Sequence, residues 1–225
     1  TGNRVRMDGL SYSVSSPNIS TGHKSTLAFG LHEMEERELV KCWLPRNLPA
    51  IELGGGLGVV SCLTNRLLDD PSQHIVVEAN PYMVPVLLRN RDLNGCKFQV
   101  VNTAIAYDGE TVTFPIDPEF VGSNLAAVGD SAETVAVEAT TLAALADFER
   151  FSLIADIEGA EADIILRELP RLRSRVRFAM IELHPYVYGQ AKADELMAAM
   201  SRMGFELLQR LGEGDVFSVA YRSVS

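Results

Sequence analysis

The sequence predicts an α/β fold with a parallel β-sheet and helices on both of its faces. From residue 50 onward, short apolar runs typical of buried strands alternate with longer runs of helical periodicity. The first strand-like run leads into its helix through a glycine-rich turn. The last two strand-like runs are joined only by Gly212-Glu-Gly-Asp215, a connection so short that they must pair antiparallel.

Composition limits the classes of partner. The chain has 225 residues, 47% of them hydrophobic, which is enough for one sizeable core, and no apolar run reaches the roughly 18–20 residues of a membrane span. The formal net charge of −10 argues against a nucleic-acid partner, because phosphate binding needs clustered Lys and Arg. Three cysteines without a CxxC pattern indicate free thiols in a reducing, cytoplasmic setting. The oligomeric state stays open.

The first 30 residues are polar and rich in Ser, Gly and Asn, and we expect a loose N-terminal arm or lid before one domain at 31–225. Residues 20–25 could cover a pocket. Residues 31–44 carry apolar side chains at helical spacing, and Pro45 ends that helix. Its acids Glu33, Glu35 and Glu36 suit the first turns of a helix and are expected on a solvated face.

The remaining elements follow in a regular order. Strands are expected at 50–54, 74–79, 98–102, 151–157, 177–183, 205–211 and 216–222. Helices are expected at 57–69, 80–94, 142–148, 162–169 and 191–203. Between them, residues 105–140 contain two alternating runs and a turn signal, which predicts a β-hairpin insertion carrying the loop at 121–127 toward the active face.

The glycine turn predicts a ligand-binding loop. Glu52 ends the first strand, and Gly54, Gly56 and Gly58 follow it. Glycines let the backbone approach a ligand closely, and the helix that starts there directs unpaired N–H groups at an anionic group such as a carboxylate or phosphate. Glu78, twenty residues after Gly58, ends the second strand, where a carboxylate can accept from both ribose hydroxyls.

Both a dinucleotide and S-adenosylmethionine fit such a loop. The dinucleotide fingerprint G-x-G-x-x-G/A fails, because its last position falls on Val59 or Ser61. The pattern present, E-x-G-x-G-x-G, resembles the first motif of the Rossmann-like methyltransferases, in which the loop packs against the methionine part of the cofactor. Seven strands with the last one antiparallel also resemble that class. A nicotinamide-dependent oxidoreductase remains the alternative, as does a cofactor-binding protein without catalysis.

Ionisable groups recur at the strand ends, where ligands of open parallel sheets bind. These groups are Glu52, Glu78, Asp156, Glu158, Glu182 and His184. Capping of the next helix or solvation is an equally good explanation for each acid taken singly, and Asp156, Glu158 and Glu161 all precede a helix, where acids are stabilising. A base that removes a hydroxyl proton could be His184 or Asp156, although His184 before Pro185 could be structural. Of the other histidines, His74 is expected at the surface. Asp156, Glu158 and His184 could hold Mg²⁺, but their spacing does not dictate it, and we expect no metal.

Four segments together resemble the FkbM-type methyltransferases, over about residues 31–184. They are Leu31-His-Glu-Met-Glu-Glu-Arg-Glu-Leu39, Val101-Asn-Thr-Ala104, Asp156-Ile-Glu-Gly-Ala-Glu161 and Glu182-Leu-His-Pro185. The third is the most specific. The family often has Asp-x-Gly-Ala-Asn where this chain has Glu52-Leu-Gly-Gly-Gly56. It often carries a Lys at the position of Ile154, so any role of that Lys in substrate handling is lost or moved here.

The resemblance implies S-adenosylmethionine as methyl donor and O-methylation of a small-molecule, sugar or natural-product hydroxyl. It places the cofactor by position on the glycine loop, the ends of the second and third strands and the fourth strand. These residues are Glu52, Gly54, Gly56, Gly58, Glu78, Ala79, Asn80, Thr103, Ala104 and Asp156. The acceptor is not determined by the sequence.

Overall fold

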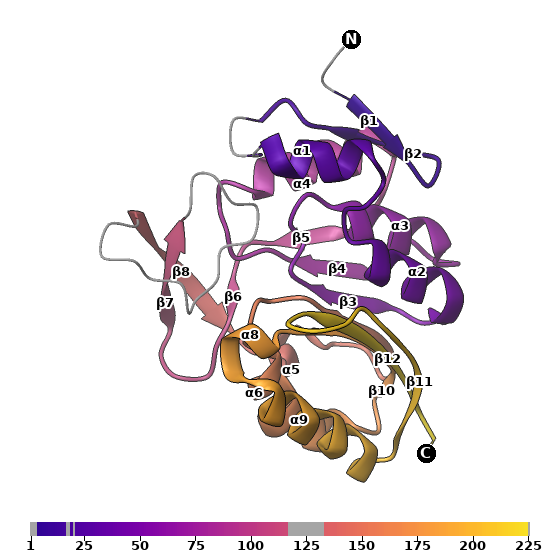
Figure 1. The fold of residues 1–225 in the computed structure, drawn as a ribbon, viewed down its shortest axis with the longest axis vertical. Helices are drawn as coiled ribbons and strands as arrows, with labels where there is room; N and C mark the ends of the chain where they lie inside the picture. Colours follow the sequence, from indigo (N-terminus) through magenta and orange to yellow (C-terminus); the bar gives the residue numbers. More distant parts are fainter. Residues whose placement is uncertain (1–3, 17–18, 20, 117–132, 225) are drawn as a thin grey trace.

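A computed structural model describes residues 4–16, 19, 21–116 and 133–224. Its centre is a seven-stranded sheet in the order β11-β12-β10-β9-β3-β4-β5 (Figure 1). The strands are β3 Ala50–Leu53, β4 His74–Val77, β5 Gln99–Val101, β9 Phe151–Ala155, β10 Val176–Leu183, β11 Phe205–Leu211 and β12 Phe217–Ser223. In this sheet β12 runs antiparallel to both of its neighbours, and the other pairings are parallel. The predicted fold class is confirmed.

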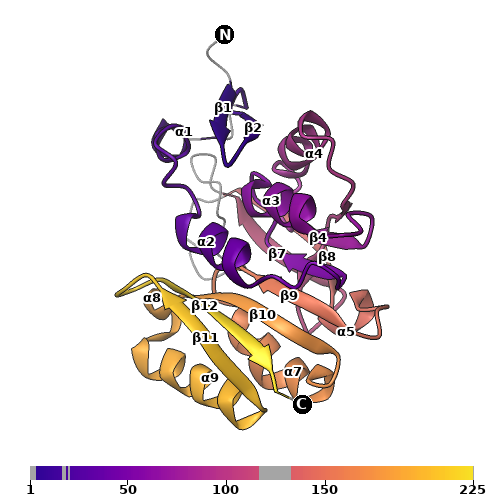
Figure 2. The same ribbon diagram turned by 90° about the vertical axis from the view of Figure 1, so that its right-hand side faces the viewer.

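Helices cover both faces of the sheet, as expected from strands that are apolar on both sides (Figure 2). One face is covered by α2 Met34–Trp43, α3 Val59–Leu67 and α4 Val84–Leu93. The other is covered by α5 Leu142–Leu145, α6 Glu161–Asp163, the π-helical turn η1 Ile164–Glu168, α7 Leu169–Leu172 and α9 Gln190–Arg202. The short helix α8 Pro185–Tyr188 follows β10. Alternate residues of each strand enter the two cores, for example Ile154 and Leu153 of β9.

The N-terminal residues are more ordered than a loose arm. Strands β1 Arg4–Met7 and β2 Leu10–Ser13 form a hairpin, and α1 Thr21–Ala28 follows. Leu10 and Tyr12 are buried in the core beside α3 and α4. The amide oxygens of Asn90 and Asn94 on and after α4 accept from the backbone N–H groups of Ser13 and Ser11 at 2.7 and 2.8 Å. Asparagine side chains therefore hold the hairpin against α4.

The insertion contains the predicted hairpin. Strands β7 Thr111–Ile116 and β8 Glu133–Thr140 pair antiparallel. An additional strand that the sequence did not indicate, β6 Ala104–Ile105, pairs parallel with β8. The loop at 121–127, expected to reach the active face, lies outside the described residues. Among the described helices, none combines the length and apolar character that crossing a membrane requires.

Candidate active site

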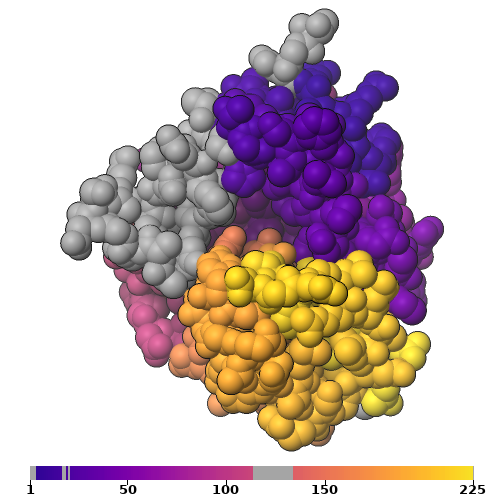
Figure 3. All heavy atoms as spheres, in the orientation of Figure 1, coloured from indigo at the N-terminus to yellow at the C-terminus, as the bar shows by residue number. Residues whose placement is uncertain are grey.

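The glycine loop follows β3 at the carboxyl edge of the sheet. In the space-filling view, the N-terminal part of the chain, in indigo and purple, meets the C-terminal part, in orange and yellow (Figure 3). The backbone N–H groups of Gly54 and Gly55 both donate to the Val77 carbonyl of β4, at 2.9 and 3.0 Å. At Gly54, φ is +91°, and an added Cβ would overlap the carbonyl oxygen of Asp156. Here the absence of a side chain lets the loop touch the end of β9.

Gly56 has a different reason for lacking a side chain. Its φ is +47°, and the nearest described atom to an added Cβ would be Glu33 Oε1 at 3.9 Å. Among the described residues, no atom fills the space beside Gly56, whereas the space beside Gly54 is filled by the protein. Gly58 is the N-cap of α3.

Glu78 lies against the glycine loop. One oxygen accepts from the Gly56 N–H and the other from the Asn80 N–H, both at 2.7 Å. Burial raises the pKa of Glu78, and these backbone hydrogen bonds oppose that effect. Each carboxylate oxygen keeps a further acceptor direction for a ligand hydroxyl. Asn80 is buried, and its Oδ1 caps the following turn by accepting from the Tyr82 N–H at 3.0 Å.

The side chains at the end of β5 serve the fold. The Thr103 hydroxyl donates to the Glu138 carbonyl of β8 at 2.6 Å, and Ala104 is buried under the insertion. Because these side chains are used within the fold, only the backbone of Thr103 and Ala104 is left to contact a ligand. Ala79, after Glu78, packs on the same small core as Ala104.

Glu52 is buried on the α3 side of the sheet, with 1% of its surface exposed. It accepts a hydrogen bond from the Ser61 hydroxyl, and its Oε2 lies 3.2 Å from His74 Nε2. The prediction that His74 lies at the surface is wrong, since His74 is fully buried. The side chains of residues 52 and 74 share one sheet face because Ala50 pairs with His74 in adjacent parallel strands.

A small cavity next to the glycine loop is lined by four carboxyl groups. They belong to Glu33 and Glu36 of the α2 region, Glu52 of β3 and Asp156 after β9. The rest of its wall consists of Gly54, Gly55, Val60, Ile154 and Met180. This arrangement contradicts the expected solvated face of α2, because Glu36 is only 3% exposed and accepts from the Ser218 hydroxyl.

Glu33 occupies the position that we expected a ligand anion to take. Its Oε2 accepts from the Val60 N–H in the first turn of α3 at 3.2 Å, and its Oε1 lies 3.1 Å from His32 Nε2. The start of α3 is thus already paired with a carboxylate of the chain. Val60 supplies only one of the N–H groups at this helix start, so a ligand carboxylate or phosphate there stays a prediction.

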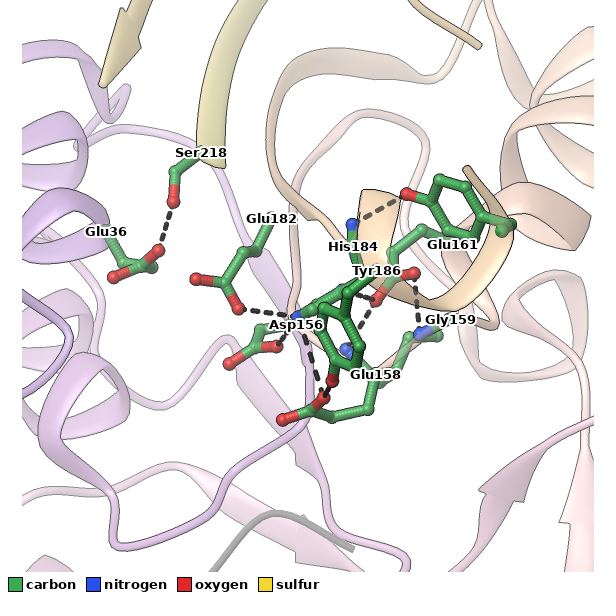
Figure 4. Close-up of polar contacts among 11 residues, drawn as sticks. Glu36, Asp156, Glu158, Gly159, Glu161, Glu182, His184, Tyr186 and Ser218 are labelled. Atoms are coloured by element: carbon green, nitrogen blue, oxygen red, sulfur yellow. Dashed lines mark hydrogen bonds and ion pairs between the residues drawn. The ribbon is translucent and has the colours of Figure 1, made fainter. Parts of the chain in front are cut away.

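His184 lies among four carboxyl groups at the end of β10 (Figure 4). Its Nε2 is 2.9 Å from Glu182, 3.5 Å from Asp156 and 3.8 Å from Glu158, and its Nδ1 is 3.1 Å from Glu161. Burial alone would lower the pKa of His184, but the carboxylates, led by Glu161, outweigh it and raise the pKa to about 9. His184 is therefore an imidazolium at neutral pH in the free protein.

Glu161 fixes the orientation of that imidazole. It is fully buried, and its two oxygens accept from the backbone N–H groups of Ile157 and Gly159, each at 2.9 Å. The sequence suggested only a helix-capping acid here. Glu158, with φ +55°, accepts from the Tyr186 hydroxyl at the rim of the same cluster.

The carboxyl groups of this region repel one another. Burial and the neighbouring Glu182 raise the pKa of Asp156 well above its usual range. Burial and the neighbouring Glu36 raise the pKa of Glu182 to about 10. Within the described part of the chain, every ion pair made by the acids of the cavity and the His184 cluster is with a histidine, and none is with Lys or Arg.

Asp156, Glu161 and His184 bring one possible metal-ligand atom each within 4.8 Å of one another. Both oxygens of Glu161 already accept backbone N–H groups, and each ring nitrogen of His184 faces a carboxylate. These contacts orient the three side chains within the chain itself.

Comparison with known proteins gives a family match. A model of the methyltransferase FkbM domain matches residues 54–207, from the glycine loop into β11. No curated protein matches the chain.

Solved structures share the fold at low identity. A ribosomal protein methylase from Lactobacillus delbrueckii subsp. bulgaricus is 13% identical, with a TM-score of 0.52 and coverage of 86% of this chain and 79% of that one. Precorrin-6y C5,15-methyltransferase from Geobacter metallireducens is 14% identical, with a TM-score of 0.50 and coverage of 85% and 88%. The fibrillarin pre-rRNA processing protein of Methanococcus jannaschii is 11% identical, with a TM-score of 0.52 and coverage of 98% and 81%.

Proposed function

The chain belongs to the FkbM methyltransferase family, and we propose that it is an S-adenosylmethionine-dependent O-methyltransferase. The acceptor in this proposal is a hydroxyl of a small molecule, a sugar or a natural product. The family match agrees with the resemblance in the sequence motifs. The similar structures differ in the substrates that their names give, so the fold alone does not select an acceptor.

The observation that carries this proposal is the wall of carboxyl groups without Lys or Arg partners in the described residues. S-adenosylmethionine brings a sulfonium and an ammonium into such a site, and both are stabilised by nearby carboxylates. A nicotinamide dinucleotide would bring a doubly negative pyrophosphate, which the same wall would repel. The acid wall therefore favours the methyl donor over the dinucleotide.

The loop and strand ends suggest how the donor lies. Glu78 accepts from the ribose hydroxyls, with Ala79, Asn80, Thr103 and Ala104 around the nucleoside. The open side of Gly56 admits the sugar and the sulfur. The methionine end lies with its ammonium toward the acid-lined cavity beside the loop, whose wall includes Glu52 and Asp156.

Methyl transfer to a hydroxyl is an in-line displacement. The acceptor oxygen forms a bond to the methyl carbon while the bond from carbon to sulfur breaks and its electron pair stays on sulfur. The hydroxyl proton passes to a base, for which we propose the pair of His184 and Asp156, 3.5 Å apart. The positive sulfonium lowers the pKa of both groups, so donor binding helps to remove the proton that His184 holds in the free protein.

Calorimetric titration with S-adenosylhomocysteine tests the cofactor, with NADH as the comparison ligand. We expect saturable binding of the first and none of the second. Binding of NADH alone would replace this proposal by the oxidoreductase alternative. Release of S-adenosylhomocysteine from S-adenosylmethionine in the presence of a library of hydroxyl compounds then separates an enzyme from a cofactor-binding protein without turnover.

The free thiols of Cys42, Cys62 and Cys96 support our placement of the protein in the cytoplasm.

A further inference from the structure

Glu33 precedes the range matched by the family model, yet it belongs to the wall beside the glycine loop. It is the N-cap of α2, with φ 48° and ψ 43°, a left-handed conformation that is uncommon for a residue other than glycine. Such a conformation persists where its surroundings hold it. Two sets of contacts fix the turn here. The Glu33 carboxylate contacts the Val60 N–H and His32, and Arg37 donates to the carbonyls of Gly30 and His32.

The contacts of Glu33 keep it charged. Burial would raise its pKa, but His32 and the Val60 N–H outweigh that effect, and the pKa of Glu33 lies below its usual range. The carboxylate is also the described group nearest to the open side of Gly56. Any donor that lies along the glycine loop therefore meets a negative charge at this point.

The neighbouring oxygens select the kind of group that can approach. Asp156 Oδ1 and Glu52 Oε2 are buried and accept no hydrogen bond from a described residue, although Asp156 Oδ1 lies 3.5 Å from His184 Nε2 and Glu52 Oε2 lies 3.2 Å from His74 Nε2. Both residues line the cavity together with Glu33. A carboxylate would be repelled from this wall, whereas an ammonium has three N–H donors to share among acceptors.

We propose that the Glu33 carboxylate, at the start of α3 and beside Gly56, binds the ammonium group at the amino-acid end of the methyl donor. This inference rests on the proposed function, since it names a further contact for the same cofactor. Glu33 stays on the Val60 N–H in the complex and uses its remaining acceptor directions for the ammonium. The donor carboxylate then points away from α3.

The test is a cycle of two proteins and two ligands. The proteins are the wild type and Glu33→Gln, and the ligands are S-adenosylhomocysteine and its deamino analogue, which differ only in the ammonium group. We expect the wild type to bind the deamino analogue about 10-fold or more weakly, as for loss of a charge-assisted hydrogen bond. In Glu33→Gln the preference should fall to about 2-fold or less, because the charge that the ammonium recognises is gone.

Glu38→Gln is the matched control, because Glu38 lies on the same helix, carries the same charge and is exposed. It should keep the wild-type preference. If Glu33→Gln does not fold, Glu33→Asp takes its place, and the withdrawn carboxylate should reduce the preference at least about 3-fold.

Three results would overturn the inference in different ways. Equal weakening of both ligands by Glu33→Gln would show that Glu33 only supports the loop. Tighter binding of S-adenosylhomocysteine by Glu33→Gln would show that Glu33 competes with the donor carboxylate. Absence of binding of S-adenosylhomocysteine to the wild type would remove the proposed function as well, which the other two results would leave intact.

Discussion

Replacing Glu182 by Gln should make the free protein more stable at alkaline pH. The side chain of Glu182 is 17% exposed and lies 2.9 Å from His184. Burial and the carboxylate of Glu36 raise its pKa from 4.5 to about 10. The folded state therefore holds a proton on Glu182 between these two values, while the unfolded state has released it. A Gln at this position is neutral in both states and can still accept from His184.

The magnitude follows from proton linkage. Each pKa unit corresponds to about 1.36 kcal/mol, and pH 8 lies about 3.5 units above the unfolded value, which gives an upper bound of about 5 kcal/mol. Proton sharing with Asp156 and the remaining contact with water reduce the cost, so we expect Glu182→Gln to gain about 2 kcal/mol at pH 8. A carboxyl group whose pKa is raised on folding destabilises the folded state above its unfolded pKa, so its removal stabilises the protein there. The gain vanishes near pH 4.5, grows as the pH rises, and levels off near pH 10.

Urea denaturation followed by far-UV circular dichroism at pH 5, 6.5 and 8 measures this gain. Glu149→Gln, which removes an exposed carboxylate, is the control and should change little at any of these pH values. A gain that does not increase with pH, or a loss of stability at pH 8, would refute the idea that crowded carboxyl groups destabilise the free protein.

Four further variants test individual parts of the site. Gly54→Ala should fail to fold, because its Cβ would overlap the Asp156 carbonyl. Gly56→Ala should fold with a loss of about 1 kcal/mol of stability for its left-handed φ, and it should lose cofactor binding. Thermal melts measure the stability of each variant, and titrations measure its cofactor binding. Wild-type kcat/KM should rise with pH along a limb near 9 as the raised pKa of His184 is passed, and His184→Gln should remove that limb from the pH profile. Glu78→Gln should weaken S-adenosylhomocysteine and 5′-methylthioadenosine alike, by about 10-fold in calorimetry, since both carry the ribose; an effect on only one of them would contradict its ribose role.

The sheet and its helices were predictable because each depends on a local pattern. The apolar run at 151–157 is long and β-branched enough to show a buried strand, and the short turn at 212–215 fixes the direction of the last one. The strands of the first hairpin have only four residues each, and their burial depends on α3 and α4, which are distant in the sequence. A polar segment with little periodicity therefore concealed an ordered element.

The site was predictable only in part. Residues of the glycine loop, Glu78 and Asp156 stand at strand ends, and parallel strands bring such ends to one edge. Glu36 shows why the remainder was not found, since an acid on an amphipathic helix is normally solvated and only the meeting of α2 with β12 buries it. Glu161 was concealed by its place at a helix start, where acids cap. A signal for Glu36 existed in its spacing to Val40, four residues on, which is fully buried on the same helix.

A crystal structure with S-adenosylhomocysteine measures the central claim most directly. We predict the ribose hydroxyls within about 2.6–3.2 Å of the Glu78 carboxylate, and the sulfur on the side of the loop that faces Asp156 and His184. A bound nucleoside with Glu78 turned away from its sugar, or a ligand whose phosphate or carboxylate takes the place of Glu33 at α3, would contradict the assignment of this acid-lined edge to a cationic methyl donor.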